Sequence, residues 1–257
     1  MLNIIISASS KYKELVNIFL EQYTKHMALN DANLFIASDE DINVDYPIKC
    51  KYINKEETIP GRIREIVQNE GEGYYLCFLA DALICKNVKG EDVISFIDTM
   101  MSNGIRYCNL MPKTNKKCLF ENINKKQRYG VSFIAFLASS DFIMEEFAKG
   151  ITDYDFEEKY LKIANEASND RYPDMCILCK NLFNIEHGIV GGKWDRKTYK
   201  ILMKDGVCIS NQIEKQSMRD YLFQKAARIV NKCMPNSIRL FLKRRMEKRG
   251  EKFKTAL

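Results

Sequence analysis

A buried strand that ends at a single acidic residue constrains the fold of this chain more than any other feature. Residues Tyr74 to Leu79 are apolar or aromatic at successive positions, which is typical of a strand covered on both faces. Asp81 follows this strand after Ala80. Ligands of open parallel sheets bind beyond the carboxyl ends of the strands. Asp81 is therefore a candidate ligand-binding residue, and its alternative role is to cap the turn that follows the strand.

The rest of the first 112 residues alternates between strand and helix patterns. Apolar runs predict strands at residues 2–6, 33–37, 49–53, 74–79 and 105–110, and helical spacing predicts helices at 15–23, 59–69 and 93–101. This alternation predicts an α/β fold with a parallel sheet and flanking helices. Ser7 and Asp39 also follow predicted strands, so we expect them at the same edge as Asp81.

The pattern becomes irregular after residue 112. Residues 113–128 form a polar stretch that predicts a loop, followed by a predicted strand at 129–137 and a helix at 141–149. An acidic segment follows at 153–158, and a segment rich in glycine lies at 188–194. We divide the chain into residues 1–112, residues 113–216 as the second half of the same domain, and a tail at 217–257.

The tail carries most of the positive charge. Residues 219–257 hold 12 Lys and Arg against three acidic residues, a net of +9, whereas residues 1–218 hold 28 and 31, a net of −3. Apolar residues at helical spacing oppose this charge, which predicts an amphipathic basic helix. Such a helix either lies at an anionic membrane surface or packs as a solvated helix on the main body.

The nine cysteines have no repeating spacing. The chain begins Met-Leu-Asn-Ile-Ile-Ile, without the basic start of an export signal, so we expect free thiols in a reducing cytoplasm. Cys176 and Cys179 form a single CxxC pair, and a structural zinc site needs four ligands. We therefore interpret both as buried thiols.

Five segments, taken in order, resemble a family of small bacterial glycosyltransferases of capsule and O-antigen assembly. The family has an Arg-bearing helix, an apolar strand ending in Leu-Asp-Asp, a strand with Leu-x-Pro, an acidic segment and a Gly-Ile-Val-x-Gly-Lys-Trp stretch. The matching segments are Arg62-Ile63, Leu79-Ala80-Asp81, Leu110-Met111-Pro112, Tyr154-Asp155-Phe156-Glu157 and Gly188-Ile189-Val190-Gly191-Gly192-Lys193-Trp194. The resemblance extends over residues 60–206.

The resemblance implies a GT-A-like nucleotide-sugar-binding sheet with flanking helices, to which the basic helical tail is added. It implies transfer of a sugar from a nucleotide-sugar donor to a hydroxyl of a lipid-linked glycan, at the cytoplasmic face of the membrane. In the family, the carboxylates at the strand end hold Mg²⁺ or Mn²⁺ at the donor diphosphate. The donor-binding residues implied here are Ser7, Asp39, Arg62, Asp81 and Lys193.

Ala80 departs from the family pattern, because a second acid stands there in the family. A lone carboxylate binds Mg²⁺ weakly unless phosphates and another side chain complete the coordination. His187 is the predicted second metal ligand beside Asp81. Alternatively, the reaction runs without a metal, with Lys193 or Arg62 countering the phosphate charge, or the protein has lost activity.

Three further residues have competing roles. Asp155 is the predicted general base, with Glu157 as the second catalytic candidate, but acids at this position also stabilise a helix N-terminus. Trp194 either stacks on an acceptor sugar or lies in the core.

Two functional alternatives differ in class from a transferase. Ala80 favours a non-catalytic relative that binds a nucleotide sugar or a glycan. The basic tail alone would suit a nucleic-acid-binding protein, but no aromatic residues interleave with basic ones outside the tail, so we predict no nucleic-acid partner.

Overall fold

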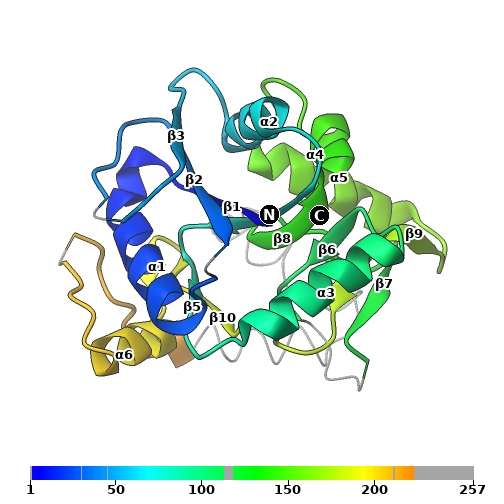
Figure 1. Ribbon diagram of the computed structural model, residues 1–257. Helices are drawn as coiled ribbons and strands as arrows, with labels where there is room; N and C mark the ends of the chain where they lie inside the picture. The colour runs from blue at the N-terminus through cyan, green and yellow to red at the C-terminus, as the bar shows by residue number, and fades with distance from the viewer. Residues whose placement is uncertain (1, 30, 45, 113–117, 211, 223–257) are drawn as a thin grey trace.

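The computed structural model describes residues 2–222 except 30, 45, 113–117 and 211 (Figure 1). The strands of the main sheet are β1 (Leu2–Ser7), β2 (Ala32–Ser38), β3 (Cys50–Ile53), β4 (Tyr74–Leu79), β6 (Tyr107–Asn109), β7 (Phe120–Asn124), β8 (Ala135–Ser139) and β9 (Arg171–Leu178). Four shorter strands are β5 (Ala82–Ile84), β10 (Ile185–His187), β11 (Ile189–Val190) and β12 (Lys193–Trp194). The helices are η1 (Ser10–Tyr12), α1 (Lys13–His26), α2 (Ile59–Glu70), α3 (Gly90–Ser102), α4 (Ser140–Glu146), α5 (Asp153–Glu166) and α6 (Arg196–Lys204).

The main sheet has eight strands in the order β3-β2-β1-β4-β8-β6-β9-β7. β1 to β4 pair in parallel, β6 pairs in parallel with β9, and β8 runs antiparallel between β4 and β6. β7 pairs antiparallel with β9 at the edge. The sheet is therefore mixed, and its first four neighbours form the parallel part that the sequence predicts.

Helices cover both faces of this sheet, which explains why its strands are apolar at successive positions. In β1, Ile4 and Ile6 belong to one hydrophobic cluster and Ile5 to the other. The first cluster includes Phe19 of α1 and Phe96 of α3. The second includes residues of α2, α4 and α5, and Figure 1 shows these three helices grouped on one side of the sheet. The predicted α/β sheet with flanking helices is confirmed.

Several predicted elements agree closely with the structure. The strands predicted at 2–6, 33–37, 49–53 and 74–79 correspond to β1 to β4, and the helix predicted at 59–69 corresponds to α2. The polar stretch at 113–128 was expected to be a loop, but β7 occupies 120–124 within it. β8 begins at residue 135, later than the strand expected at 129–137. The amphipathic helix predicted for the tail lies outside the described residues, apart from its first few positions.

Strands from residues 1–112 and from residues 113–216 share the main sheet, since β8 pairs with both β4 and β6.

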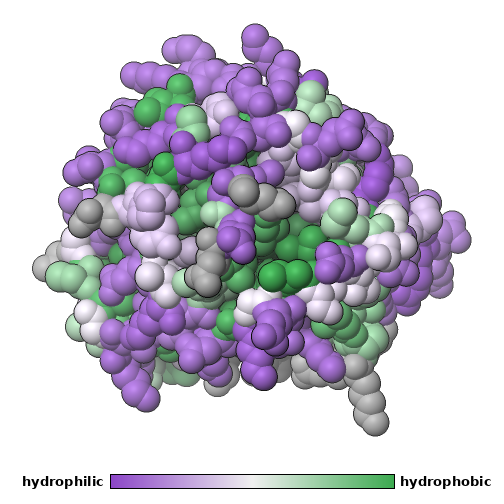
Figure 2. All heavy atoms as spheres, viewed as in Figure 1, coloured by the Kyte–Doolittle hydropathy of each residue, from purple (hydrophilic) through white to green (hydrophobic). Residues whose placement is uncertain are grey.

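None of the helices that the structure describes is long and apolar enough to cross a membrane. On the face seen in Figure 2, hydrophobic side chains gather at the centre, and hydrophilic side chains surround them.

Candidate functional site

The strand order places a topological switch point at the carboxyl end of β1. The chain runs from β1 to β2 and β3 on one side, then crosses to β4 on the other side of β1. Ligands of open α/β sheets bind at such a switch point, outside the carboxyl ends of the two diverging strands. The switch point therefore lies between the carboxyl ends of β1 and β4, where Ser7 ends β1 and Asp81 comes two residues after β4.

Ser7 ends β1 at this switch point. Its side chain is 2% exposed, and its hydroxyl has no hydrogen-bond partner among the described residues. The neighbouring backbone is fixed, because Ala80 donates its N–H to the Ser7 carbonyl over 2.9 Å and Ala8 donates to the Ala37 carbonyl over 3.1 Å. A buried hydroxyl without a partner costs free energy unless a ligand or water satisfies it. Ser7 is thus available to a ligand.

Asp39 follows β2 and links it to the segment after β1. Its carboxylate accepts hydrogen bonds from the Ser10 N–H over 2.5 Å and the Ser10 hydroxyl over 3.1 Å. Burial favours the neutral form, but these hydrogen bonds and the charge of Arg62 outweigh it and hold the pKa of Asp39 below its ordinary value. Asp39 is therefore an anion near the end of β2.

Arg62 lies in the first turns of α2, whose N-terminus Thr58 caps. The side chain is 4% exposed, and its Nη1 donates to the carbonyls of Asn54 over 3.1 Å and Glu57 over 2.5 Å. Burial holds the pKa of this guanidinium below its ordinary value, and the negative charge of the nearby Asp39 offsets only part of this shift. Its Nε has no partner among the described residues. Arg62 therefore fixes the loop between β3 and α2 and retains one free donor.

Asp81 and His187 lie on neighbouring backbone segments, because β5 follows Asp81 and pairs antiparallel with β10. His187 is opposite Ala82 in this register, and the Gly188 N–H donates to the Asp81 carbonyl over 2.6 Å. Burial raises the pKa of the Asp81 carboxyl to about 6, although its own N–H and that of Ile189 lower it. The segments that carry the two residues predicted to bind a metal are thus neighbours, although they are more than 100 positions apart in sequence.

Gly188 allows this close approach. A Cβ at this position would lie 3.1 Å from the Asp81 carbonyl oxygen and 3.1 Å from a methyl group of Leu83. Gly191 and Gly192 serve a different purpose, since their φ angles of 63° and 78° form the two-residue turn between β11 and β12. The glycine-rich segment therefore has a local structural reason at each of these three positions.

Lys193 and Trp194 lie in β12, immediately after this turn. The Lys193 ammonium forms ion pairs with Glu214 over 3.5 Å and with Asp220 over 3.7 Å. Trp194 is 0% exposed and belongs to the first hydrophobic cluster. The proposed stacking of Trp194 on an acceptor sugar does not fit this position, because no face of the indole is accessible. The alternative core role fits instead.

Asp155 has the capping role that was its structural alternative. Thr152 is the N-cap of α5, and the Asp155 carboxylate accepts from the Thr152 N–H over 3.1 Å and the Thr152 hydroxyl over 2.7 Å. Thr152 in turn accepts from the Asp155 N–H, which completes a capping box. The hydrogen bonds from Thr152 hold the pKa of Asp155 below its ordinary value. A carboxylate of lowered pKa is a weaker base.

Glu157 is hydrogen-bonded to the segment before β8, and this segment is in turn hydrogen-bonded to the end of β4. Its Oε1 accepts hydrogen bonds from the Ser132 hydroxyl over 3.0 Å and from the Phe133 N–H over 2.9 Å. The next residue, Ile134, accepts from the Leu79 N–H over 2.8 Å at the end of β4. Glu157 is half-buried, and both of these bonds use the same oxygen. Of the two predicted catalytic acids, Glu157 is the one tied to the strand edge near Asp81.

Two residues at this edge were not predicted from sequence. Asn109 is fully buried at the end of β6, where its Nδ2 donates to the Gly130 carbonyl over 2.8 Å and its Oδ1 accepts from the Met111 N–H over 2.8 Å. Tyr129 has a φ of 57°, which is rare outside glycine. Burial raises its pKa, with smaller contributions from Arg128, Glu157 and Tyr154. Asn109 could have been found from the sequence, because it is a polar residue near the end of a predicted strand. Nothing in the sequence indicates the unusual backbone conformation of Tyr129.

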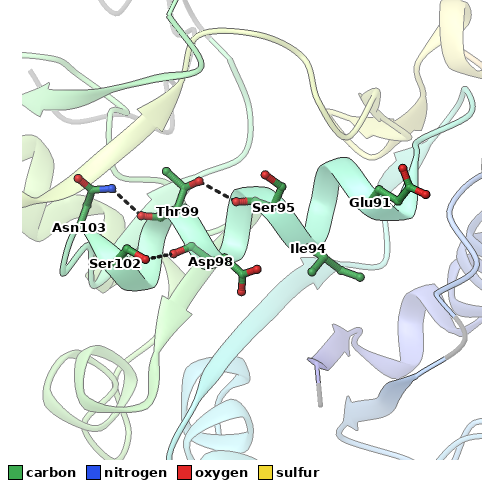
Figure 3. Close-up of a pocket in the computed structure, with 7 residues that line it drawn as sticks. All are labelled: Glu91, Ile94, Ser95, Asp98, Thr99, Ser102 and Asn103. Carbon is green, nitrogen blue, oxygen red and sulfur yellow. Dashed lines mark hydrogen bonds between the residues drawn. The ribbon is translucent and has the colours of Figure 1, made fainter.

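A separate shallow depression lies on the outer surface of α3 and contains none of the predicted site residues (Figure 3). Glu91, Ile94 and Asp98 line it. Its polar groups mostly bond within the helix, as when the Ser102 hydroxyl donates to the Asp98 carbonyl over 2.8 Å. This depression belongs to one helix surface and not to the strand edge.

The metal prediction is only partly matched by the residues present. Within the described part of the chain, no group of three or more His, Cys, Asp or Glu side chains is placed to hold a metal ion. Asp81 and His187 lie on neighbouring backbone segments, with His187 opposite Ala82. Mg²⁺ is commonly bound through one or two carboxylates together with substrate phosphates. The described residues therefore do not fit a metal site made by protein alone, and a metal at Asp81 would need phosphate oxygens as ligands.

No protein-family model and no curated protein sequence matches this chain. Among solved structures, S. aureus TarS 1–349 shares 10% identity over 69% of this chain and 58% of its own, at a TM-score of 0.44. S. aureus TarS 1–349 in complex with UDP-GlcNAc shares 10% identity over 70% of this chain and 56% of its own, at a TM-score of 0.45. CMP:2-keto-3-deoxy-manno-octonic acid synthetase complexed with CTP shares 10% identity over 69% of this chain and 88% of its own, at a TM-score of 0.40. The chain spans little more than half of these TarS chains, and TM-scores below 0.5 do not by themselves establish a common fold.

Proposed function

We propose that the chain is a glycosyltransferase that moves a sugar from a nucleotide-sugar donor to a hydroxyl of a surface glycan. One observation carries the proposal: Ser7, Asp39 and Asp81 lie at or just after the carboxyl ends of three adjacent parallel strands at the switch point. The resemblance of five sequence segments to bacterial capsule and O-antigen glycosyltransferases supplies the reaction class.

The donor diphosphate would lie at Asp81 and His187. A divalent metal, Mg²⁺ or Mn²⁺, would be held by these two side chains and by phosphate oxygens, and when bound it neutralises charge on the departing diphosphate. Arg62 keeps an unpartnered Nε. Asp39, as an anion near the end of β2, suits the hydroxyls of the donor's ribose.

Glu157 is the better candidate for the general base. The base must take a proton from the acceptor hydroxyl, so it must lie at the site of reaction and have the basicity to do so. Both carboxylates accept hydrogen bonds, but the partners of Glu157 lie in the segment that is bonded to the end of β4, whereas the partner of Asp155 is Thr152 at a helix end. We therefore propose that Glu157 is the general base that takes the proton from the acceptor hydroxyl.

The acceptor sugar would contact the aromatic side chains near Glu157. Tyr129 is half-buried and Tyr154 is 52% exposed, and both act electrostatically on one another and lie close to Glu157. Tyrosine offers an apolar ring face and a hydroxyl to a sugar. These residues replace Trp194 in the proposed acceptor site.

A non-catalytic relative that binds a nucleotide sugar is the second candidate. Ala80 favours it, because the family carboxylate is missing beside Asp81. The two candidates differ in one measurable property: a transferase is expected to hydrolyse its donor slowly when no acceptor is present, whereas a binding module is not.

A thermal-shift screen of nucleotide sugars with and without Mn²⁺ tests the proposal. A ligand at 100 times its Kd stabilises the native state by about 2.7 kcal/mol. For a chain of this size, that corresponds to a rise in Tm of roughly 5–10 °C. We expect one class of nucleotide sugar to give this rise in the presence of Mn²⁺, and the rise to shrink in His187→Ala. The absence of any shift with every donor would contradict both candidates.

We further propose that the acceptor is lipid-linked and that the basic tail holds the protein at the cytoplasmic face of the membrane. The net charge of +9 at 219–257 carries this proposal. Each base near an anionic surface contributes about 1 kcal/mol, and this attraction decays within a Debye length of about 8 Å at physiological ionic strength.

The protein is therefore expected to co-sediment with vesicles that contain anionic lipid and to be released as salt rises. Replacing Lys243, Arg244 and Arg245 with Gln should weaken this binding and leave activity on a short water-soluble acceptor unchanged. Equal binding to neutral and anionic vesicles, or no binding to either, would show that the tail is no membrane anchor.

A further inference from the structure

Two cysteine side chains lie in direct contact at the edge of the main sheet. The Sγ atoms of Cys118 and Cys179 are 2.9 Å apart. Cys118 comes two residues before β7, and Cys179 comes directly after β9. The antiparallel register places Phe120 opposite Leu178, and Cys179 donates its N–H to the Leu119 carbonyl over 2.9 Å. Backbone pairing therefore holds the two thiols together.

The two thiols differ in access to solvent. Cys118 is exposed, whereas Cys179 is 2% exposed. Thiol–disulfide exchange requires an accessible thiolate to attack first and a second thiol nearby to resolve the mixed disulfide. An exposed cysteine in contact with a buried one has this arrangement.

We propose that Cys118 and Cys179 form a reversible disulfide by exchange with low-molecular-weight disulfides. The Cys118 thiolate attacks a small disulfide, forms a mixed disulfide and releases one small thiol. Cys179 then loses its proton and attacks the Cys118 sulfur, which releases the second small thiol. The two cysteines lose two protons and two electrons in total, and the small disulfide is reduced to two thiols.

The other cysteines that the structure describes lack one part of this arrangement. Cys108 and Cys176 also interact with each other, but both are 0% exposed, and burial raises the pKa of the Cys108 thiol well above its ordinary value. An oxidant in solution has no access to them. Cys208 is exposed, and no thiol contact to it is seen within the described residues. It therefore provides a matched control.

The disulfide would act on the segment that leads to His187. The chain leaves the sheet at Cys179 and then enters β10, which ends at His187. The bond joins residues 61 positions apart and would tie this exit to the start of β7. Cross-linking a loop of this length restricts the unfolded chain, so the oxidised protein should gain on the order of 5 °C in Tm.

The test is to incubate the reduced full-length protein with oxidised glutathione and to analyse the products by intact mass and peptide mapping. In the wild type, we expect the peptides of Cys118 and Cys179 to be linked with loss of two hydrogen atoms, and neither of these two cysteines to retain glutathione. Cys179→Ser should stop at a glutathione adduct on Cys118, and Cys118→Ser should give neither a linked product nor an adduct on Cys179. Cys208→Ser should form the Cys118–Cys179 link as the wild type does.

Dithiothreitol should restore both free thiols and the lower Tm. The proposal is overturned if the wild type accumulates the same stable Cys118 adduct as Cys179→Ser, or if Cys118 links to a different cysteine. Failure to react at all would equally overturn it, because an exposed thiol in contact with a second thiol must exchange under these conditions.

Discussion

Asp81→Asn is expected to abolish sugar transfer while it makes the ligand-free protein more stable. The substitution keeps the size of the side chain and its ability to accept the N–H of Ile189, but it removes the negative charge that would meet the metal and the donor diphosphate. Loss of such a charge at the reacting group should lower kcat/KM by roughly 10³-fold or more.

The gain in stability follows from the pKa of Asp81. Burial raises this pKa to about 6, above the value of about 3.9 for an unfolded aspartate. The folded state therefore binds the proton more tightly, and the wild type loses stability as the pH rises from about 4 through 6. Asparagine cannot ionise, so the variant avoids this loss. With a discount for the partial exposure of Asp81, the gain at pH 7 should be about 1–2 kcal/mol.

Chemical denaturation of both proteins at pH 4 and pH 7 measures this effect. The stability difference should be present at pH 7 and should shrink toward pH 4. Glu186→Gln is the matched control, because Glu186 lies in the same small sheet and its carboxylate pairs with Lys197 at the surface. That control should retain transfer. An Asp81→Asn variant with wild-type transfer would remove Asp81 from the site.

The parts of the fold that the sequence predicted are those with strong local patterns. β1 to β4 are apolar at successive positions because both faces of the sheet are covered, and such runs are visible without any partner. β7 was missed because it is a short edge strand of mixed polarity, Phe-Glu-Asn-Ile-Asn, whose pairing with β9 comes from the tertiary fold. Its partner β9 lies inside the sheet and was missed because its first four positions are not buried and only Met175 to Leu178 form an apolar run.

The candidate site shows the same division. The role of Asp81 and His187 as metal ligands was inferred from a family resemblance and stays a prediction, and the pairing of β5 with β10 shows only that their backbone segments are neighbours. The burial of Trp194 could not be predicted, because an aromatic residue after a glycine turn suits both a binding surface and a core. Asp155 and Glu157 look equivalent in sequence, and only their hydrogen-bond partners separate them.

The different hydrogen-bond partners of Asp155 and Glu157 lead to the second large effect that we expect, a loss of turnover when Glu157 is replaced. Glu157→Gln should lower kcat by about two orders of magnitude or more, because the amide cannot take a proton from the acceptor hydroxyl. Its carbonyl oxygen can still accept from the Ser132 hydroxyl and the Phe133 N–H, so the fold and the affinity for donor should stay near those of the wild type. Stopped-time transfer assays and donor titrations measure the two quantities independently.

Asp155→Asn is the matched comparison, since it removes a carboxylate two residues away in the same helix. It weakens the capping box with Thr152 and should lower Tm slightly, with kcat unchanged. The opposite pattern, with kcat lost in Asp155→Asn and retained in Glu157→Gln, would return the role of base to Asp155. It would also require the N-terminus of α5 to change conformation when substrate binds, because the Asp155 carboxylate is held by Thr152 in the ligand-free structure. Equal loss of donor affinity and kcat in Glu157→Gln would instead show that Glu157 only supports the segment before β8, as its bonds to Ser132 and Phe133 already do.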